Sequence, residues 1–222
     1  MTCRAILFDL DGVLVDSTAS VGRVWGRWAA EHGLNAAQVV RSAHGRRSIE
    51  TIRHWLPLVD AVVENRRVEQ MEIDDTPWLH VVPGARELLA SIPNRNWGIV
   101  TSGTRALACS RLSVAGLAPP PVLITADDVS LGKPHPGPWL QGAAKLGVKP
   151  KQCVVIEDTP PGIQSAHGAG MRALALTSTC PFTAVSDAEA VVDSLSDIRI
   201  KAGANGRLML RVRCADPPWS GK

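Results

Sequence analysis

Five short apolar runs recur along the chain, and polar residues follow each of them. The runs are RAILFDL (4–10), WGIVT (97–101), VLIT (122–125), CVVI (153–156) and ALAL (173–176). Continuous apolar runs of this length are typical of strands buried on both faces, as in a parallel sheet. Between the runs, apolar residues at helical spacing within 85–92, 140–144 and 163–170 predict helices. Alternating strands and helices predict an α/β fold with right-handed crossovers.

A long interval without a strand signal separates the first run from the second. It contains three apolar stripes at helical spacing, which begin at Val21, Ile49 and Leu58, and the first of them ends at Gly33. Because the interval is too long for a plain loop, we expect an inserted α-helical cap domain at residues 16–81. The rest of the fold is predicted to be a Rossmann-like parallel sheet core at residues 1–15 and 82–213.

The C-terminal part carries a different signal. Asn205-Gly206 lies between the apolar segments 198–201 and 207–211, which predicts a β-hairpin. Residues 214–222 are polar and contain two prolines, so we expect a disordered tail.

Composition excludes several classes of protein. Lys plus Arg number 24 and Asp plus Glu number 21, a net charge of +3 that is too small to argue for a nucleic-acid or membrane partner. The longest uncharged stretch, Leu112–Ala126, has 15 residues and three prolines, so neither a membrane span nor a signal peptide is expected. Five scattered cysteines show no metal-ligand or disulfide spacing, which favours reduced thiols in a cytoplasmic protein.

Candidate catalytic residues follow the predicted strands. They are Asp9 and Asp11 after the first run, Thr101, Ser102 and Gly103 after the second, Lys133 beyond the third, and Glu157 and Asp158 after the fourth. Taken singly, each group has a local explanation as a turn, a helix N-cap or a solvated side chain. Their joint occurrence behind four strands indicates a site at the carboxyl edge of the sheet.

These residue types suit phosphoryl transfer. Clustered carboxylates repel one another unless a cation lies between them, and oxygen ligands favour a hard ion such as Mg²⁺. A metal, a lysine, hydroxyls and backbone N–H groups together can bind a phosphoryl group. One carboxylate can then attack phosphorus, and a second can move the protons.

The sequence resembles the haloacid dehalogenase superfamily of phosphotransferases, in the subgroup with a small helical cap. The resemblance covers roughly residues 4–200 and rests on four segments in order. They are FDLDGVLVDS (8–17), IVTSGT (99–104), GKPHPGPWL (132–140) and VIEDTPPGIQSAHGAGM (155–171). The dehalogenases of the superfamily lack the second aspartate, so Asp11 argues against dehalogenation.

The resemblance implies a role for each of these residues. Asp9 would be the nucleophile and Asp11 the general acid and base, while Thr101 and Lys133 would hold the transferring phosphoryl group. The implied Mg²⁺ ligands are Asp9, the backbone carbonyl of Asp11, and Asp158, with Glu157 in support.

The predicted cap carries a basic loop, His44-Gly45-Arg46-Arg47-Ser48, between its helical stripes. It resembles the substrate loop of small sugar- and polyol-phosphate phosphatases, although a solvated surface loop would also fit. The expected substrate-binding residues are His44, Gly45, Arg46 and Arg47 of the cap and Ser102 and Gly103 of the core.

The sequence therefore predicts a monomeric, cytoplasmic, Mg²⁺-dependent phosphatase of a small sugar or polyol phosphate. The alternative is a hexose-phosphate phosphomutase similar to β-phosphoglucomutase, because mutases of the family also carry an arginine in this loop. A sugar-phosphate binding protein without activity is a further alternative, which the complete set of acids disfavours.

Overall fold

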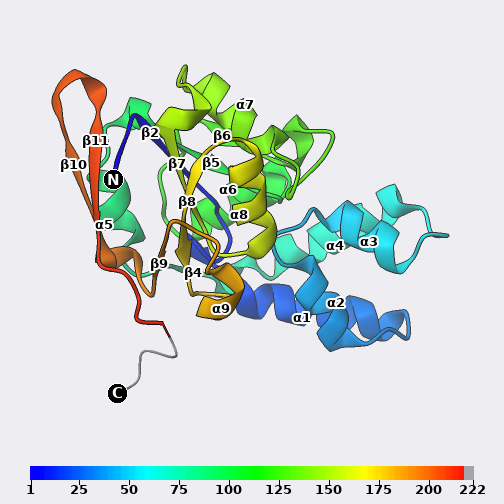
Figure 1. The fold of residues 1–222 in the computed structure, drawn as a ribbon. Coiled ribbons are helices and arrows are strands. Elements are labelled where there is room, and N and C mark those ends of the chain that lie inside the picture. Colours follow the sequence, from blue (N-terminus) through cyan, green and yellow to red (C-terminus); the bar gives the residue numbers. More distant parts are fainter. Residues whose placement is uncertain (218–222) are drawn as a thin grey trace.

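A six-stranded parallel sheet forms the centre of the structure, a computed structural model that describes residues 1–217 (Figure 1). In spatial order its strands are β6 (Leu123–Ile124), β5 (Trp97–Val100), β2 (Ala5–Phe8), β7 (Cys153–Glu157), β8 (Arg172–Leu176) and β9 (Ala190–Val192). Phe8 in β2 pairs with Ile99 in β5 and with Ile156 in β7. The residues that follow β2, β5 and β7 therefore emerge side by side at the carboxyl edge.

Helices cover both faces of the sheet, which is why its strands are apolar throughout. In β2, Ile6 and Phe8 belong to one apolar cluster, whereas Ala5 and Leu7 belong to the other. Helices α5 (Ala85–Ala90) and α6 (Arg105–Val114) lie on the first side, and α7 (Gly137–Lys145), α8 (Pro160–Gly168) and α9 (Phe182–Val185) lie on the second. The predicted α/β fold with a parallel sheet is confirmed, but the patterns did not predict β9, α6 or α9.

A second, antiparallel sheet closes one end of the core. Its strands are β1 (Thr2–Cys3), β11 (Leu208–Val212) and β10 (Ile198–Ala202). The predicted hairpin is confirmed: Asn205 and Gly206 at its turn have φ values of 57° and 70°, in the left-handed region that favours these two residue types. Residues 214–217 of the predicted tail have no helix or strand, and 218–222 lie outside the described residues.

Four helices form the inserted cap, to one side of the sheet (Figure 1). They are α1 (Thr18–Glu31), α2 (Ala36–Ala43), α3 (Ser48–Trp55) and α4 (Ala61–Asp74). Two short antiparallel strands, β3 (Val15–Asp16) and β4 (His80–Val81), join the cap to the core, and a 3₁₀ turn, η1 (Thr76–Trp78), precedes β4. The cap has its own apolar cluster, which includes Trp28, Val39 and Ile52. Its limits at residues 16 and 81 stay a prediction.

Two details of the cap differ from the sequence prediction. The apolar pattern did not predict α2, because only Val39 and Ala43 of that helix are buried. The third predicted stripe began at Leu58, but the helix α4 begins at Ala61 because the Asp60 carboxylate accepts the N–H groups of Val62 and Val63. Leu58 itself is 98% exposed.

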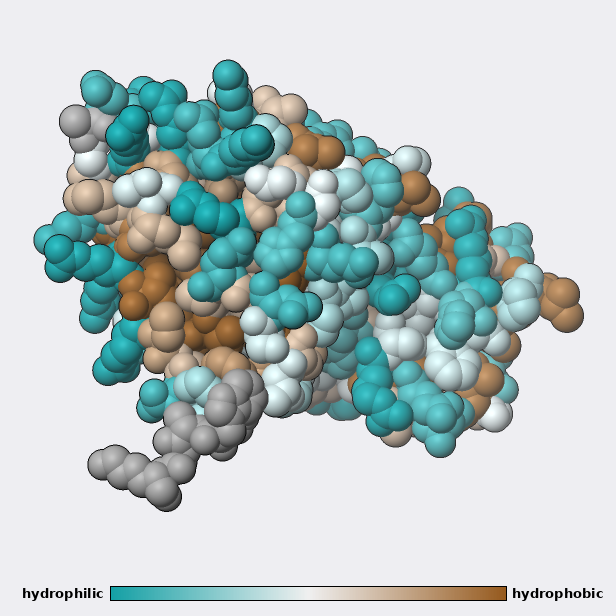
Figure 2. Space-filling model, in the orientation of Figure 1, coloured by the Kyte–Doolittle hydropathy of each residue, from teal (hydrophilic) through white to brown (hydrophobic). Residues whose placement is uncertain are grey.

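Hydrophilic side chains cover most of the face seen in Figure 2, over the core and the cap alike. Within residues 1–217, no helix is long and apolar enough to cross a membrane. All five cysteines are free thiols.

The cap cluster yields a prediction about stability. Trp28 is completely buried, and its indole N–H donates to Glu64 at 2.9 Å. Trp28→Ala should lower the free energy of unfolding by about 3–5 kcal/mol, because it leaves a cavity in the cap core. Urea denaturation followed by circular dichroism measures the change. Trp78→Ala is the control, since Trp78 is 72% exposed, and equal losses in both variants would contradict the assignment of Trp28 to the cap core.

Candidate active site

Four predicted catalytic residues meet at the carboxyl edge of the sheet. Asp9 follows β2, Glu157 ends β7, Asp158 comes next, and Lys133 reaches in from the loop beyond β6. The Asp9 N–H donates to the Ile156 carbonyl at 2.9 Å, which ties the end of β2 to β7. The sheet order β5-β2-β7 thus brings together residues that lie far apart in the sequence.

Lys133 is the cation at the centre of this group. Its side chain is 1% exposed, and its ammonium donates to Asp9 Oδ1, to Glu157 Oε1 at 2.7 Å and to the Val100 carbonyl at 3.1 Å. The ring of Trp139 lies 4.4 Å from the ammonium. Burial alone would lower the pKa of Lys133, but its two carboxylate partners outweigh burial and raise that pKa. The ammonium therefore stays charged although it is buried.

Glu157 is saturated with protein hydrogen bonds. While Oε1 accepts from Lys133, Oε2 accepts the N–H groups of Asp158 and Thr159, both at 2.8 Å, and the Thr159 hydroxyl at 2.9 Å. Burial opposes ionisation, yet Lys133 and these donors hold the pKa of Glu157 below its usual value. A Cβ at Gly162 would lie 1.7 Å from Glu157 Oε1, so a glycine is required there. Both oxygens of Glu157 are thus occupied by donors of the protein. Glu157 is therefore better suited to positioning its neighbours than to direct contact with a metal ion.

Asp9 and Asp158 carry the negative charge that the protein does not neutralise. Asp158 Oδ2 accepts the Thr179 hydroxyl at 2.5 Å, whereas its Oδ1 is buried and has no hydrogen-bond partner in the described part of the chain. Oxygen atoms of Asp9, Glu157 and Asp158 lie within 4.8 Å of one another. Burial, together with the neighbouring carboxylates, raises the pKa of Asp9 to about 7 although Lys133 lowers it, and the same two causes raise the pKa of Asp158 well above its usual value. This arrangement can hold a hard divalent cation.

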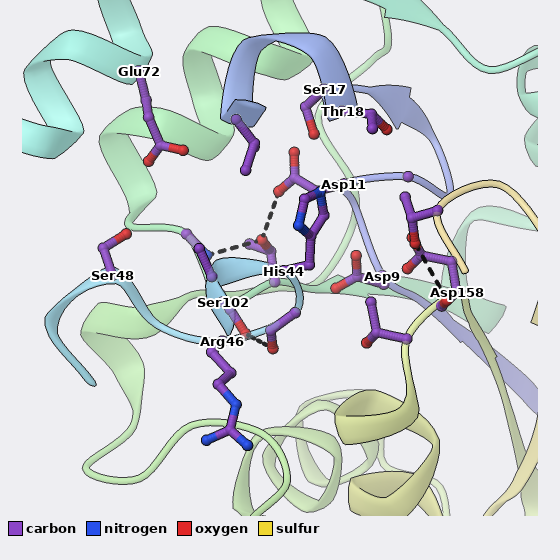
Figure 3. A pocket seen from close by; sticks show the side chains of 18 of the residues that line it. Asp9, Asp11, Ser17, Thr18, His44, Arg46, Ser48, Glu72, Ser102 and Asp158 are labelled. Atoms are coloured by element: carbon purple, nitrogen blue, oxygen red, sulfur yellow. Dashed lines mark hydrogen bonds between the residues drawn. The ribbon is translucent and has the colours of Figure 1, made fainter. Parts of the chain in front are cut away.

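Asp11 points away from the three clustered acids. Its Oδ1 lies 2.8 Å from Nη1 of Arg111, and its Oδ2 accepts a long hydrogen bond, 3.4 Å, from the Thr101 hydroxyl (Figure 3). Thr101 also accepts the Gly103 N–H at 3.1 Å. Asp9 and Asp11 nevertheless line the same cavity, as the sequence predicts for two acids of one strand end.

The cap loop closes this cavity, which has a volume of about 60 Å³. His44, Gly45 and Arg46 line it from the cap, and Ser102 and Gly103 line it from the core. The Ser102 hydroxyl donates to the Gly45 carbonyl at 3.0 Å (Figure 3). The space between the cap loop and the core thus admits only a few water molecules.

Arg47 does not line the cavity, although it was expected to bind substrate. Its Nη1 donates to the Ser130 carbonyl at 2.7 Å, and its side chain packs where Gly132 leaves room. The Gly132 N–H donates to Glu50 at 3.0 Å. In this arrangement Arg47 and Glu50 hold the cap against the loop that precedes Lys133, and substrate binding by Arg47 stays a prediction.

Sequence reasoning missed three residues of the site: Glu72, Arg111 and Thr179. Arg111 lies between Leu107, Ala108 and Leu112 on the buried face of α6. A charged residue within such an apolar stripe indicates a buried ion pair, because a buried charge needs a partner. This pattern could have identified Arg111 from the sequence. Thr179 and Glu72 show no comparable pattern.

The fold and these residues define an enzyme that acts at the carboxyl edge of a parallel sheet, beneath a helical cap. A family model of haloacid dehalogenase-like hydrolases matches residues 3–170, and the chain belongs to this family. It is 37% identical to hexitol phosphatase A of Escherichia coli, over 95% of this chain and 100% of that protein. It is 30% identical to 2-deoxyglucose-6-phosphate phosphatase 1 of Saccharomyces cerevisiae, over 93% of this chain and 94% of that one.

Solved structures show the same fold. The β-phosphoglucomutase of Clostridium difficile superimposes with a TM-score of 0.79 at 22% identity, and the match covers 89% of this chain and 93% of that one. The confirmed resemblance to the haloacid dehalogenase superfamily therefore extends to the fold of the core with its inserted cap.

The Lys133 network yields a prediction. Lys133→Met should lower the free energy of unfolding by about 3–5 kcal/mol at about pH 8, because it leaves two buried carboxylates without their cation. The loss should shrink towards about pH 6, since burial raises the pKa of Asp9 to about 7 and protonation removes the uncompensated charge below that value. Denaturant titrations at both pH values measure it. Lys145→Met is the control, as that side chain is 46% exposed, and a loss independent of pH would argue against the network.

Proposed function

We propose that this protein is a Mg²⁺-dependent phosphatase that hydrolyses a small sugar or polyol phosphate. The observation that carries the proposal is the single cavity lined by Asp9, Asp11, Thr101 and Asp158, with Lys133 bonded to Asp9 behind it. The kinship with hexitol and deoxyglucose-6-phosphate phosphatases supports the substrate class. All of these residues come from one chain, so a monomer suffices for the reaction.

The donor set fits Mg²⁺. The buried Oδ1 of Asp158 has no partner within residues 1–217, and a Cβ at Gly12 would lie 2.1 Å from the other oxygen, Oδ2, so the loop after β2 approaches this carboxylate closely. Asp158, Asp9 and the backbone carbonyl of Asp11 would hold the ion, with Glu157 in support. When bound, Mg²⁺ would offset the repulsion between the Asp9 carboxylate and an anionic phosphoryl group.

The residues supply a double displacement. The Asp9 carboxylate attacks phosphorus, and the bond to the leaving oxygen breaks while Asp11 donates a proton to that oxygen. Asp11 then takes a proton from water, whose oxygen attacks the phosphorus of the aspartyl-phosphate. Free phosphate and the Asp9 carboxylate result. Thr101 would hold a phosphoryl oxygen during both steps, and Lys133 would do the same by exchanging one of its three present acceptors for a phosphoryl oxygen.

A hexose-phosphate mutase remains the alternative, because the β-phosphoglucomutase structure shares this fold. The test is product analysis with a panel of hexitol, hexose and glycerol phosphates. A phosphatase releases one free phosphate for each ester consumed. Isomerised sugar phosphate without phosphate release would establish the mutase and overturn the proposal.

The nucleophile is tested by Asp9→Asn. This isosteric change should preserve the fold and lower turnover by roughly a thousandfold or more, since no other carboxylate is placed to attack phosphorus. Phosphate release and circular dichroism measure the two effects. Asp187→Asn, at an exposed position, is the matched control. Near-normal hydrolysis by a folded Asp9→Asn variant would refute the assignment.

The metal is tested without an assay of activity. At about pH 8, Mg²⁺ at about 100 times its Kd should raise Tm by about 5–10 °C. The shift should be smaller at about pH 6, because burial raises the pKa values of Asp9 and Asp158 and protons then compete with the ion. Asp158→Ala should abolish the shift and Asp187→Ala should not. An unchanged shift in Asp158→Ala would place the ion elsewhere.

A further inference from the structure

Arg111 forms a buried bridge between the core and the cap. It projects from α6 and is 3% exposed. Its Nη1 lies 2.8 Å from Asp11 Oδ1, and its Nη2 donates to Glu72 Oε1 at 3.2 Å. Glu72 lies near the end of the cap helix α4 and is 4% exposed. One guanidinium therefore joins the predicted general acid and base to a carboxylate of the cap.

The charges explain why these three groups stay together. Arg111 and Glu72 are buried and would each be costly to bury alone, while the Asp11 side chain is 25% exposed at the cavity. Arginine suits the position because its planar fork presents separate N–H groups to the two acids, whereas lysine offers a single point of charge. Among the described residues, neither Nε of Arg111 nor Oδ1 of Asp11 has a hydrogen-bond partner. The guanidinium therefore contacts Asp11 as an ion pair through Nη1 and donates a hydrogen bond to Glu72 through Nη2.

The core and the cap contact each other next to the ion pairs of Arg111. Helix α4 and the 3₁₀ turn η1 that follows it both contact α6. Beside the bridge, the hydroxyls of Thr76 and Ser110 lie 3.0 Å apart and form a hydrogen bond. Glu72 and Asp11 both line the cavity, and the Glu72 carboxylate lies to the left of Asp11 in Figure 3. Arg111 thus lies where the base of the cap meets the core.

Asp11 needs such a support. The hydrogen bond that Asp11 accepts from Thr101 is 3.4 Å long, which is too long to fix a carboxylate. The buried ammonium of Lys133 attracts any carboxylate of the site, and an Asp11 turned towards it would leave the position from which a leaving oxygen can be protonated. A proton donor must stay within hydrogen-bond reach of that oxygen.

We propose that Arg111 is a positioning residue for Asp11, and that Glu72 holds the guanidinium in place for this task. This inference rests on the proposed function, because it assigns Asp11 to proton transfer. Arg111 acts through Asp11, and its ion pairs are with Asp11 and Glu72 rather than with the three clustered acids.

A double-mutant cycle tests the proposal. The variants Arg111→Lys, Asp11→Asn and the double variant are compared on glucitol 6-phosphate and on p-nitrophenyl phosphate. Arg111→Lys alone should lower kcat on glucitol 6-phosphate by about 10- to 100-fold with KM changed by less than about threefold. In the Asp11→Asn background, the same change should alter kcat by less than about twofold, because the group that it positions is gone. The loss should be smaller on p-nitrophenyl phosphate, whose leaving group departs without a proton.

Two further variants separate positioning from stability. Glu72→Gln keeps the size of the side chain but removes the charge that pairs with Arg111. The variant should therefore lower kcat, by a smaller factor than Arg111→Lys does. Arg105→Lys is the matched control on α6, where an exposed arginine pairs with Asp128 at 2.7 Å, and its kcat should equal that of the wild type. Thermal unfolding of every variant shows whether the fold is intact.

The outcomes are distinct. If Arg111→Lys lowers kcat by the same factor in the wild-type chain and in the Asp11→Asn background, Arg111 acts independently of Asp11 and the inference is overturned, while the proposed function stands. Unchanged kcat in a folded Arg111→Lys variant overturns it as well. A wild-type protein that releases phosphate from neither ester overturns the proposed function and the inference together.

Discussion

The active site depends on one buried ammonium. Asp9, Glu157 and Asp158 all lie in the interior at the edge of the sheet, and the Lys133 side chain bonds two of them. A single cation cannot neutralise three carboxylates. The structure divides the charge unequally: Glu157 is ionised and saturated with donors, while the pKa values of Asp9 and Asp158 are raised. The remaining negative charge lies at the two acids that a divalent cation would contact.

The fit of the cap against the core depends on two close approaches of backbone. Gly45 has φ +73°, and a Cβ there would lie 2.5 Å from the Thr159 hydroxyl oxygen, while a Cβ at Gly132 would lie 2.5 Å from Arg47 Cδ. Thr159 also bonds Glu157, and Gly132 directly precedes Lys133. The cap loop therefore rests on the same segments that position the charged centre.

The sequence predicts those features that depend on the burial pattern of neighbouring residues, and it does not predict those that depend on contacts between distant segments. Strands such as β2 and β7 were predictable because burial on both faces leaves a continuous apolar run, and the acids could be placed because parallel strands end at one edge. The helix α2 escaped prediction because it buries too few apolar residues to form a stripe. The loop His44–Ser48 was found, but the direction of each side chain was not. Arg46 lines the cavity whereas Arg47 turns to Ser130, because the contact with the core loop decides the direction.

The pair Asp9 and Asp11 shows how one segment supplies two different carboxylates. Strand β2 ends at Phe8, and the chain then turns at Gly12, whose φ is +79°, so the two side chains reach different surroundings. Asp9 faces Lys133 and two acids, where burial raises its pKa to about 7, whereas Asp11 faces Arg111 and Thr101. Enzymes assign separate roles to neighbouring acids by separating their environments in this way. Because the partners of Asp9 all belong to the core while those of Asp11 lead through Arg111 to the cap, Asp9 is fixed at the edge of the sheet and Asp11 is held where the core meets the cap.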